Sequence, residues 1–405
     1  MLAAVTSQTL DREPACPEAD PVPRDDAAGA PALRAVPRVI ADIPRSTWDA
    51  LHARTTWATP FSAWAFQRAW WDAYGENAHD ETLVVLPADV VPDDMLAEPV
   101  AIVPLMHRHE VEPTDADLHT TMRHGRDAEL TAVAPDATAV FFGASYHADY
   151  ATILAARADL PAVAEAVATY FAAERAGEPW DVVDLRRLRC GDPAAEALAD
   201  ALGSRGAQEG WTTTLEREDV CPVVTLPDRV DLDGFLATLG KKERHEIRRK
   251  CRRAEAAGEV RLTDSTDPIG DLETFIDLHQ KRWGAAGLFP PTPGGDQSRV
   301  LFRRLFELFG ADGPLRLAFL TVGDRRIAAG VHFETDDGYL YYNAGVDPDA
   351  RELSPGVVMV QAYVQRAIAQ GMRRLDFLRG DEPYKYEWGA VDEPIQRLLV
   401  QRRDQ

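Results

Sequence analysis

The stretch Tyr339–Val357, YLYYNAGVDPDARELSPGV, decides the fold, because it has the pattern of a strand that turns directly into a helix. Its apolar beginning, Tyr339–Val346, predicts the strand, and Pro355 suits the first turn of a helix that we predict over 355–370. The free N–H groups and the dipole at such a helix start attract anions. Gly356 would let a phosphate approach the backbone closely. The stretch therefore predicts a strand, an anion-binding turn and a helix.

Three apolar runs in the second half of the chain are separated by tight turns. The turns Gly323-Asp324 and Asp337-Gly338 are hairpin signals, so we predict antiparallel strands over 315–322, 326–334 and 339–346. Around them the periodicity predicts helices over 233–257, 267–283 and 298–309, and strands over 260–263, 374–378 and 396–401. The predicted order is β-α-α-β-β-β-α-β-loop-β.

The first half has a mixed α/β pattern. We predict strands over 81–87, 99–107, 140–142 and 180–185, and helices over 63–74, 161–174 and 193–203. Residues 1–36 are rich in Ala, Pro and Asp and have neither period, so we expect a disordered tail. The predicted domains are residues 37–216 and 217–405.

Composition and charge exclude several classes of protein. Of the 405 residues, 45% are hydrophobic and 27% charged, which is typical of globular proteins and excludes a mainly disordered chain. The net charge is −22, and the first 220 residues hold 17 Lys and Arg against 37 Asp and Glu. From Cys221 onward these numbers are 27 and 29. Such acidity argues against DNA as a partner, because phosphate binding needs a concentrated positive face.

Compartment and metal content follow from what the sequence lacks. It contains no apolar run of about 18 residues, so we expect no membrane span, and its first residues do not resemble a signal peptide. The four cysteines, Cys16, Cys190, Cys221 and Cys251, have no metal-ligand spacing. We therefore expect a cytoplasmic protein with reduced thiols and no metal.

The strand order and the hexapeptide Arg351-Glu352-Leu353-Ser354-Pro355-Gly356 together resemble the GNAT acyltransferases. In that superfamily an Arg/Gln-x-x-Gly-x-Gly/Ala loop at this junction binds the pyrophosphate of coenzyme A, and Ser354 stands here at the first glycine. The resemblance implies acetyl-CoA or another acyl-CoA as co-substrate. It implies as cofactor-binding residues Gly345, Val346, Arg351, Ser354, Pro355, Gly356 and Val357.

A second stretch, Leu375–Trp388 (LDFLRGDEPYKYEW), is similar to CelD-like acetyltransferases, a GNAT branch related to Fem-type peptidyltransferases. The segments 239–242, 282–283 and 60–71 resemble the same branch, so the resemblance covers about residues 38–400. It implies an α/β (α+β) fold of two tandem GNAT-like domains, each a mixed, mostly antiparallel sheet flanked by helices. The first domain would lack a working cofactor loop.

The chemistry of acyl transfer and this resemblance select candidate catalytic residues. Transfer from a thioester needs an oxyanion donor, a base for the acceptor and a proton for the thiolate. Lys385 follows an aromatic residue, as in Fem-type relatives, and is the candidate oxyanion donor; the alternative is a solvated loop lysine. Asp376 and Asp381 are candidate bases or orient Lys385. Tyr384 is a candidate acid, although packing explains a tyrosine equally well.

Six further residues are candidates for substrate binding: His279, Trp283, His332, Asn343, Arg379 and Glu382. His279 and Trp283 lie one helical turn apart, and helix packing explains them nearly as well. His332 and Asn343 lie on neighbouring predicted strands, and a histidine on an alternating strand is more often a core residue.

A run of cations in 241–253 interrupts the acidic background. Lys241, Arg244, Arg248 and Arg252 share one predicted helix face. That face could hold a phosphorylated acceptor, the cofactor's ribose phosphate or tRNA. It could equally form ion pairs with the acidic first half.

The leading functional hypothesis is an acyl-CoA-dependent N- or O-acyltransferase, with acetyl transfer as the first expectation. The acceptor would be a small or sugar-linked molecule bound between the two domains. One alternative is a Fem-like aminoacyl-tRNA-dependent transferase that forms an amide bond, with tRNA the less favoured partner given the net charge. The other is a non-catalytic binding protein, which the departure at Ser354 allows.

Overall fold

The computed structural model describes residues 32–108, 130–134, 137–173 and 180–402. Most of the expected tail, residues 1–31, lies outside these ranges. Leu33–Pro37 forms strand β1, so regular structure begins earlier than the sequence predicts. This strand is too short for a clear period, and its antiparallel pairing with β3 (Leu83–Pro87) stabilises it.

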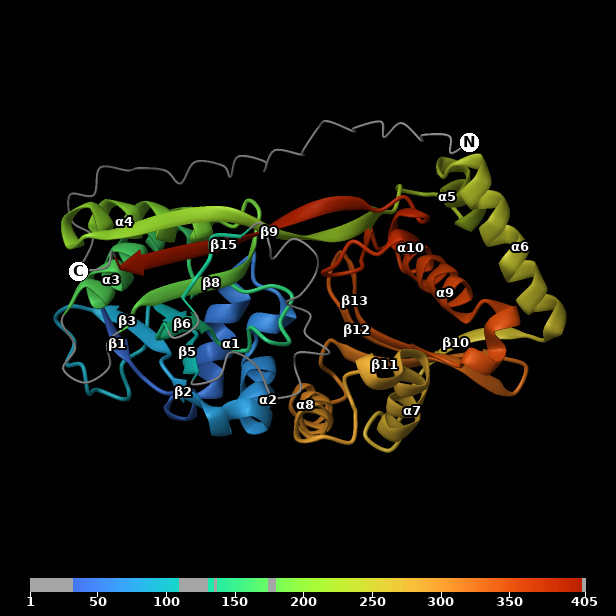
Figure 1. Ribbon diagram of the computed structural model, residues 1–405, viewed down its shortest axis with the longest axis horizontal. Coiled ribbons are helices and arrows are strands. Elements are labelled where there is room, and N and C mark those ends of the chain that lie inside the picture. The colour runs from blue at the N-terminus through green and yellow to red at the C-terminus, as the bar shows by residue number, and fades with distance from the viewer. Residues whose placement is uncertain (1–31, 109–129, 135–136, 174–179, 403–405) are drawn as a thin grey trace, which may run out of the picture.

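The two halves of the chain lie side by side along the long axis of the molecule (Figure 1). Besides β1 and β3, the first half contains strands β2 (Ala78–Asp80), β4 (Ala101–Val103), β5 (Leu105–Arg108), β6 (Ala139–Phe142), β7 (Leu154–Ala155) and β8 (Val182–Arg189). Its helices are α1 (Arg45–Arg54), α2 (Trp64–Tyr74), α3 (Leu160–Ala172) and α4 (Pro193–Glu209). The predicted mixed α/β character of this half is confirmed.

The second half follows the predicted order closely. Its strands are β10 (Val260–Asp264), β11 (Leu315–Val322), β12 (Arg325–Glu334), β13 (Gly338–Val346) and β14 (Arg374–Asp376), and its helices α5 (Leu232–Thr238), α6 (Lys241–Ala257), α7 (Leu272–Trp283), α8 (Pro293–Phe309), α9 (Pro355–Ala369) and α10 (Pro383–Tyr386). The single helix predicted over 233–257 is wrong. The chain is extended at Leu239 and Gly240, so α5 ends and α6 begins in a new direction.

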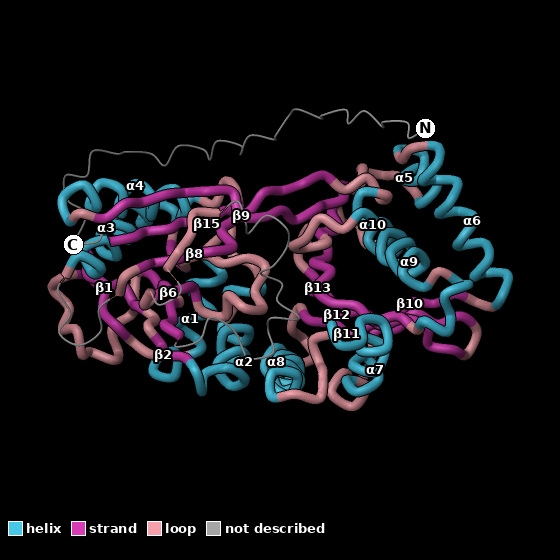
Figure 2. The backbone as a smooth tube through the Cα atoms, in the orientation of Figure 1, coloured by secondary structure: helices cyan, strands magenta, loops and turns pink. Residues whose placement is uncertain are grey.

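One sheet of eleven strands runs through both halves, in the order β10-β11-β12-β13-β14-β9-β15-β8-β6-β5-β2. Its centre consists of two long antiparallel strands, β9 (Trp211–Thr225) and β15 (Val391–Arg402), which bridge the halves (Figure 2). A smaller sheet, β1-β3-β4-β7, completes the first half. The division at 216/217 stays a prediction, and β9 passes through it without a break.

Each half contains one parallel strand pair joined by a helix. In the second half α9 connects β13 to β14, and in the first half α3 lies between β6 and β8. The other strand pairs of the described residues are antiparallel. This confirms the mixed, mostly antiparallel sheet that the sequence predicts.

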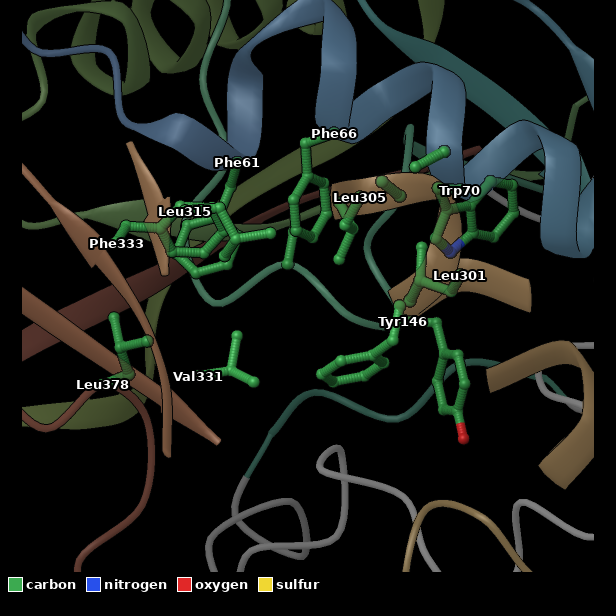
Figure 3. Close-up of a cluster of buried hydrophobic side chains, with 14 of the residues drawn as sticks. Phe61, Phe66, Trp70, Tyr146, Leu301, Leu305, Leu315, Val331, Phe333 and Leu378 are labelled. Carbon is green, nitrogen blue, oxygen red and sulfur yellow. The ribbon is translucent and has the colours of Figure 1, made fainter. Parts of the chain in front are cut away.

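A shared hydrophobic core joins the two halves (Figure 3). Phe61, Phe66 and Trp70, at and before α2, pack against Leu301 and Leu305 of α8 and against Phe333 of β12. The Phe61 and Phe333 rings lie 5.4 Å apart in an edge-to-face contact. Because these residues come from both halves, the walls of a site between them are held in fixed positions.

Two sequence expectations concern the chain as a whole. Within the described ranges, no helix combines the length and the apolar character that a membrane crossing requires. Cys221 and Cys251 are buried free thiols, but Cys190 is disulfide-bonded, so the expectation of reduced thiols is wrong for Cys190.

Candidate functional site

The candidate site lies where the parallel strands β13 and β14 separate. They pair only from Gly338 to Leu340, opposite Arg374 to Asp376. Beyond this point β13 continues and β14 ends, so Tyr341–Ala344 and Phe377–Arg379 diverge and line a cavity of about 310 Å³. We call this cavity the strand-gap pocket. The rest of its wall comes from α7, from α10 and the residue before it, and from the first half.

A β-bulge shapes the β13 side of the pocket. Val331 of β12 pairs with Asn343 and His332 pairs with Tyr341, so Tyr342 is an extra residue in β13. A bulge interrupts the ladder and leaves the extra residue unpaired. Backbone amide groups at Tyr342 and Asn343 are therefore candidate hydrogen-bond donors to a ligand, and the predicted residue Asn343 lines the pocket.

Helix α7 forms the wall beside β13. His279 donates through Nδ1 to the carbonyl of Ala344 at 3.1 Å, and its Nε2 accepts from the Leu288 amide at 3.2 Å. Burial lowers the pKa of His279 to about 4, so the ring is neutral at pH 7. With both nitrogens bonded, His279 positions the wall. A Cβ atom at Gly345 would clash with the backbone nitrogen of His279, so this glycine permits the close contact of α7 and β13.

The outer edge of the pocket is cationic and aromatic. Arg282 lies over the ring of Trp283 at 4.6 Å from its centroid, and Trp283 is 42% exposed. Arg282 and Trp283 line the pocket together with His279. The predicted substrate residues His279 and Trp283 therefore belong to one wall.

Sequence reasoning missed the wall that the first half contributes, His147 and Asp149. They lie in the connection between β6 and α3, the counterpart of the β13–α9 connection. The His147 Nε2 lies 2.8 Å from the Tyr74 hydroxyl, and Tyr342 donates to the His147 carbonyl at 3.1 Å. No motif marks these two residues. The one available signal is a run of small and aromatic residues between predicted elements.

Arg379 joins the two halves at the floor of the pocket. Its Nε donates to Asp149 at 3.3 Å, and its side chain is only 2% exposed. Arg187 lies near it, and burial, followed by the nearby Arg379 and Arg186 guanidinium groups, lowers the pKa of Arg187. Arg187 also pairs with the buried Glu218. The predicted substrate residue Arg379 is therefore part of a buried network of arginines and carboxylates that touches the pocket.

Lys385 is buried and holds the loop that follows β14. Its ammonium group donates to the carbonyls of Leu378, Arg379 and Gly380 at 3.1, 3.0 and 2.9 Å. It also pairs with Glu382 at 2.8 Å. The three ammonium protons thus serve four acceptors. A ligand could bond to this group only by displacing one of these acceptors. Lys385 and Glu382 both line the pocket.

The other predicted catalytic residues occupy different positions. Tyr384 lines the pocket, and burial, followed by Tyr341 and Glu382, raises its pKa, so its hydroxyl keeps its proton. Asp376 is 1% exposed, lies outside the pocket lining and accepts from the Tyr150 hydroxyl and the Leu378 amide, each at 2.8 Å. Asp381 is exposed and is not part of the lining either.

His332 lies in the core on the α9 face of the sheet, away from the pocket lining. Its Nδ1 is 2.8 Å from the Tyr363 hydroxyl, its ring contacts Tyr339, and burial lowers its pKa. The core alternative that the sequence allowed describes this environment.

The predicted cofactor loop forms a separate cluster at the start of α9. Ser354 has φ +54 and ψ +54, the left-handed conformation that favours glycine. The Ser354 N–H donates to the Arg351 carbonyl, and the Val357 N–H donates to the Ser354 carbonyl. Pro355 has no N–H group. Among the four residues from Ser354 to Val357, Gly356 alone retains an N–H for an anion.

The surroundings of this turn are cationic and open. Arg253 of α6 donates to the Ser354 hydroxyl at 2.8 Å, and Arg351 is exposed. A Cβ atom at Gly356 would meet nothing within 4 Å. Val346 is half-buried, Pro355 is buried, and Val357, at the helix start, is half-buried.

The basic face of α6 lies at the end of the molecule away from the first half (Figure 1). Arg248 of this face pairs with Asp233, and the neighbouring Arg249 pairs with Glu246, both in the second half. Among the described residues, this face has no ion pair with the acidic half. Lys241, Arg244, Arg248 and Arg252 line one surface hollow, as their spacing predicts. Across the described ranges, no group of three or more His, Cys, Asp or Glu side chains could hold a metal ion.

Comparisons with known proteins agree with this geometry. The model of the acetyltransferase (GNAT) domain family matches residues 241–386, a range that contains α9, both diverging strands and most of the pocket wall. No curated protein matches the sequence.

Solved structures resemble the chain along most of its length. The crystal structure of FemX aligns with 88% of this chain and 96% of its own, at 11% identity and a TM-score of 0.50. A conserved protein of unknown function from Bacteroides thetaiotaomicron aligns with 89% of this chain and 98% of its own, at 13% identity and a TM-score of 0.50. At these identities the likeness concerns the fold, and the fold extends over both halves.

Proposed function

We propose that this protein transfers an acyl group from a coenzyme A thioester to a nucleophile bound in the strand-gap pocket. The observation that carries the proposal is the separation of the parallel strands β13 and β14, which opens a pocket to the second substrate. The helix that connects these strands begins at an open, cationic turn. A donor that lies between them would place its pyrophosphate at the turn and its thioester at the pocket.

The turn at Ser354 supplies the features that a pyrophosphate needs. The Gly356 N–H, the positive end of the α9 dipole and the guanidinium group of Arg253 lie at it, and the exposed Arg351 precedes it in the chain. Gly345 and Val346 would lead from the turn to the pocket along β13. In this proposal they border the donor, while the close packing of Gly345 on α7 keeps the strand in place.

The chemistry follows from the pocket wall. The nucleophile attacks the thioester carbonyl, the amides of the Tyr342 bulge stabilise the oxyanion, and the carbon–sulfur bond breaks. Tyr384, whose raised pKa keeps its hydroxyl protonated, is the proton source that the wall offers to the thiolate. His147 and Glu382 are the proton acceptors that the wall offers to the nucleophile. Lys385 acts as a positioning residue for the loop 378–380.

A second candidate, an aminoacyl-tRNA-dependent transferase, is supported by two observations. The turn before α9 keeps one free N–H group of the three between Ser354 and Val357, fewer than a strong pyrophosphate site would offer. The basic face of α6 is exposed at the end of the same half. The two candidates share the pocket and differ in the donor.

Titration calorimetry with coenzyme A, acetyl-CoA and an aminoacyl-tRNA distinguishes the donors. In the Gly356→Glu variant a carboxylate would occupy the phosphate position, so the Kd for coenzyme A should rise more than tenfold. The variant has room for its side chain and should fold. Gly203→Glu on α4 is the matched control, because a Cβ there also meets nothing within 4 Å. Equal binding by both variants would refute the donor position, and binding of the tRNA alone would support the second candidate.

Tyr384→Phe tests the proposed acid. The turnover number should fall by about 10²-fold or more, with coenzyme A affinity nearly unchanged, because the proton is needed only when the thiolate leaves. Tyr386→Phe is the control, since the Tyr386 hydroxyl bonds to Asp392 outside the pocket. A fully active Tyr384→Phe enzyme would remove Tyr384 from the mechanism.

A further inference from the structure

Arg379 is a buried guanidinium group with unused hydrogen-bonding capacity. Its Nε makes the single side-chain hydrogen bond that the described residues give it, to Asp149. Neither terminal amino group has a partner in the described part of the chain, although the residue is 7% exposed overall. The side chain lines the strand-gap pocket, so its small exposed surface faces this cavity.

Such an arrangement is costly unless a ligand completes it. A buried charge is normally paired and hydrogen-bonded, and a guanidinium group presents five donors in one plane. Here one donor is used by a single carboxylate at the long distance of 3.3 Å. Arg187, also buried nearby, pairs with Glu218 through Nη1, while its Nε and Nη2 atoms have no partner among the described residues.

We propose that Arg379 binds a carboxylate of the acceptor, and that the acceptor is an amino acid or a molecule that ends in one. This rests on the proposed function, because it assigns the acceptor of the same pocket. The two terminal amino groups of Arg379 match the two oxygens of a carboxylate in one plane.

The other charges of the pocket favour an acceptor with both signs of charge. Asp149 and Glu382 line the same cavity as Arg379, so a free dianion such as a phosphate would meet two carboxylates there. An amino acid places its single negative charge on Arg379 and its ammonium group near these carboxylates. A cavity of about 310 Å³ suits a ligand of this size.

The position of the charges also fits the reaction. With the carboxylate on Arg379 the amino group lies in the pocket beside His147 and Glu382, one of which takes its proton. The amine nitrogen then bonds to the acyl carbon as the carbon–sulfur bond breaks. Tyr384 protonates the leaving thiolate, and the second proton of the amine nitrogen restores the Tyr384 hydroxyl. The products are an N-acyl amino acid and coenzyme A.

Matched pairs of acids and amides test the proposal. The probes are the standard L-amino acids and their C-terminal carboxamides, titrated into the full-length protein by calorimetry without a donor. The same pairs are then tested with acetyl-CoA by release of free thiol. At least one acid should bind tenfold or more tightly than its amide, because a charged bidentate pair replaces a neutral contact.

Three variants assign that preference to Arg379. Arg379→Gln should abolish it, and Arg379→Lys, which still carries a charge for Asp149, should weaken acid binding at least severalfold because a lysine lacks the planar pair of donors. Arg303→Gln, an exposed arginine of α8, is the matched control and should keep the preference. Retention of the preference in both Arg379 variants would overturn the proposal.

The two arms separate this inference from the proposed function. The binding arm contains no donor, so equal binding, or no binding, of every acid and its amide counts against the carboxylate site whatever the donor is. A preference for acids together with no consumption of acetyl-CoA would keep the carboxylate site and reject the donor.

Discussion

The buried ammonium group of Lys385 shows what a single residue does at this site. In sequence it is a lysine between two tyrosines, and the resemblance to Fem-type relatives makes it a catalytic candidate. In the structure it caps three consecutive carbonyls of a loop in which Leu378 and Gly380 have positive φ values. These carbonyls converge on one point, and a cation placed there stabilises the loop.

Lys385→Met should therefore lower the free energy of unfolding by about 3 kcal/mol or more, because several buried acceptors lose their donor. Urea denaturation measures this change, and Lys242→Met, at an exposed lysine of α6, is the control with little expected effect. If Lys385→Met kept the stability of the unmodified protein and lost only turnover, Lys385 would be the oxyanion donor of the original hypothesis.

At the scale of elements, the contact of α7 with β13 fixes one wall of the pocket. Gly345 lets the helix approach, and His279 connects it to the Ala344 carbonyl and to the Leu288 amide. The bond from the Leu288 amide requires the neutral ring, since Nε2 must accept, whereas Nδ1 can donate to Ala344 in either state. The contact is therefore sensitive to acid.

The free energy of unfolding should fall as the pH decreases from 6.5 towards 4. Over this window the unfolded chain protonates His279, whereas the folded protein holds it neutral down to a pKa of about 4. The full difference is about 3 kcal/mol for this group, present above pH 6.5 and lost near pH 4.

Urea unfolding of the unmodified protein and of His279→Gln at pH 7 and pH 4 measures the contribution. The unmodified protein should lose about 3 kcal/mol more than the variant between the two pH values. His245→Gln, at an exposed position of α6, serves as the control. Equal losses in all three proteins would show that His279 does not titrate as its burial implies.

At the scale of the whole molecule, the two halves share one sheet and one hydrophobic core. The strands β9 and β15 pair along their length and bridge both halves, and the cluster around Phe61 and Phe333 contains residues from each. A sheet and a core shared in this way resist separate unfolding.

Phe333→Ala should destabilise the first half as much as the second. The substitution removes a fully buried ring and should cost about 3–5 kcal/mol. Hydrogen exchange read by mass spectrometry should detect the same loss of protection in β8 and in β11. Ala substitution of Phe309, a partly buried neighbour in the same cluster, should give a smaller loss. Loss of protection confined to the second half would mean that the halves unfold independently.

Local pattern determined much of the fold of this protein. The hairpin turns, the apolar runs and the Pro-Gly helix start predicted β11 to β13 and α9 in the correct order, because these signals depend on neighbouring residues. Ser354, which stands where the resemblance expects a glycine, has the left-handed conformation that favours glycine. In the same way, most of the candidate residues after β14 lie on the pocket wall.

Tertiary structure alone decided which of these residues share a site. His332 and Asp376 lie on the strands that the sequence predicts, but their side chains occupy buried positions outside the pocket lining. No local signal in the sequence specifies toward which side of the sheet they point. His147 and Asp149 reach the pocket because the β6–α3 connection crosses to the other half. Asp149 there contacts Arg379, a residue more than 200 positions away in the sequence. Long-range pairing of this kind depends on how the halves pack, which a periodic pattern does not encode.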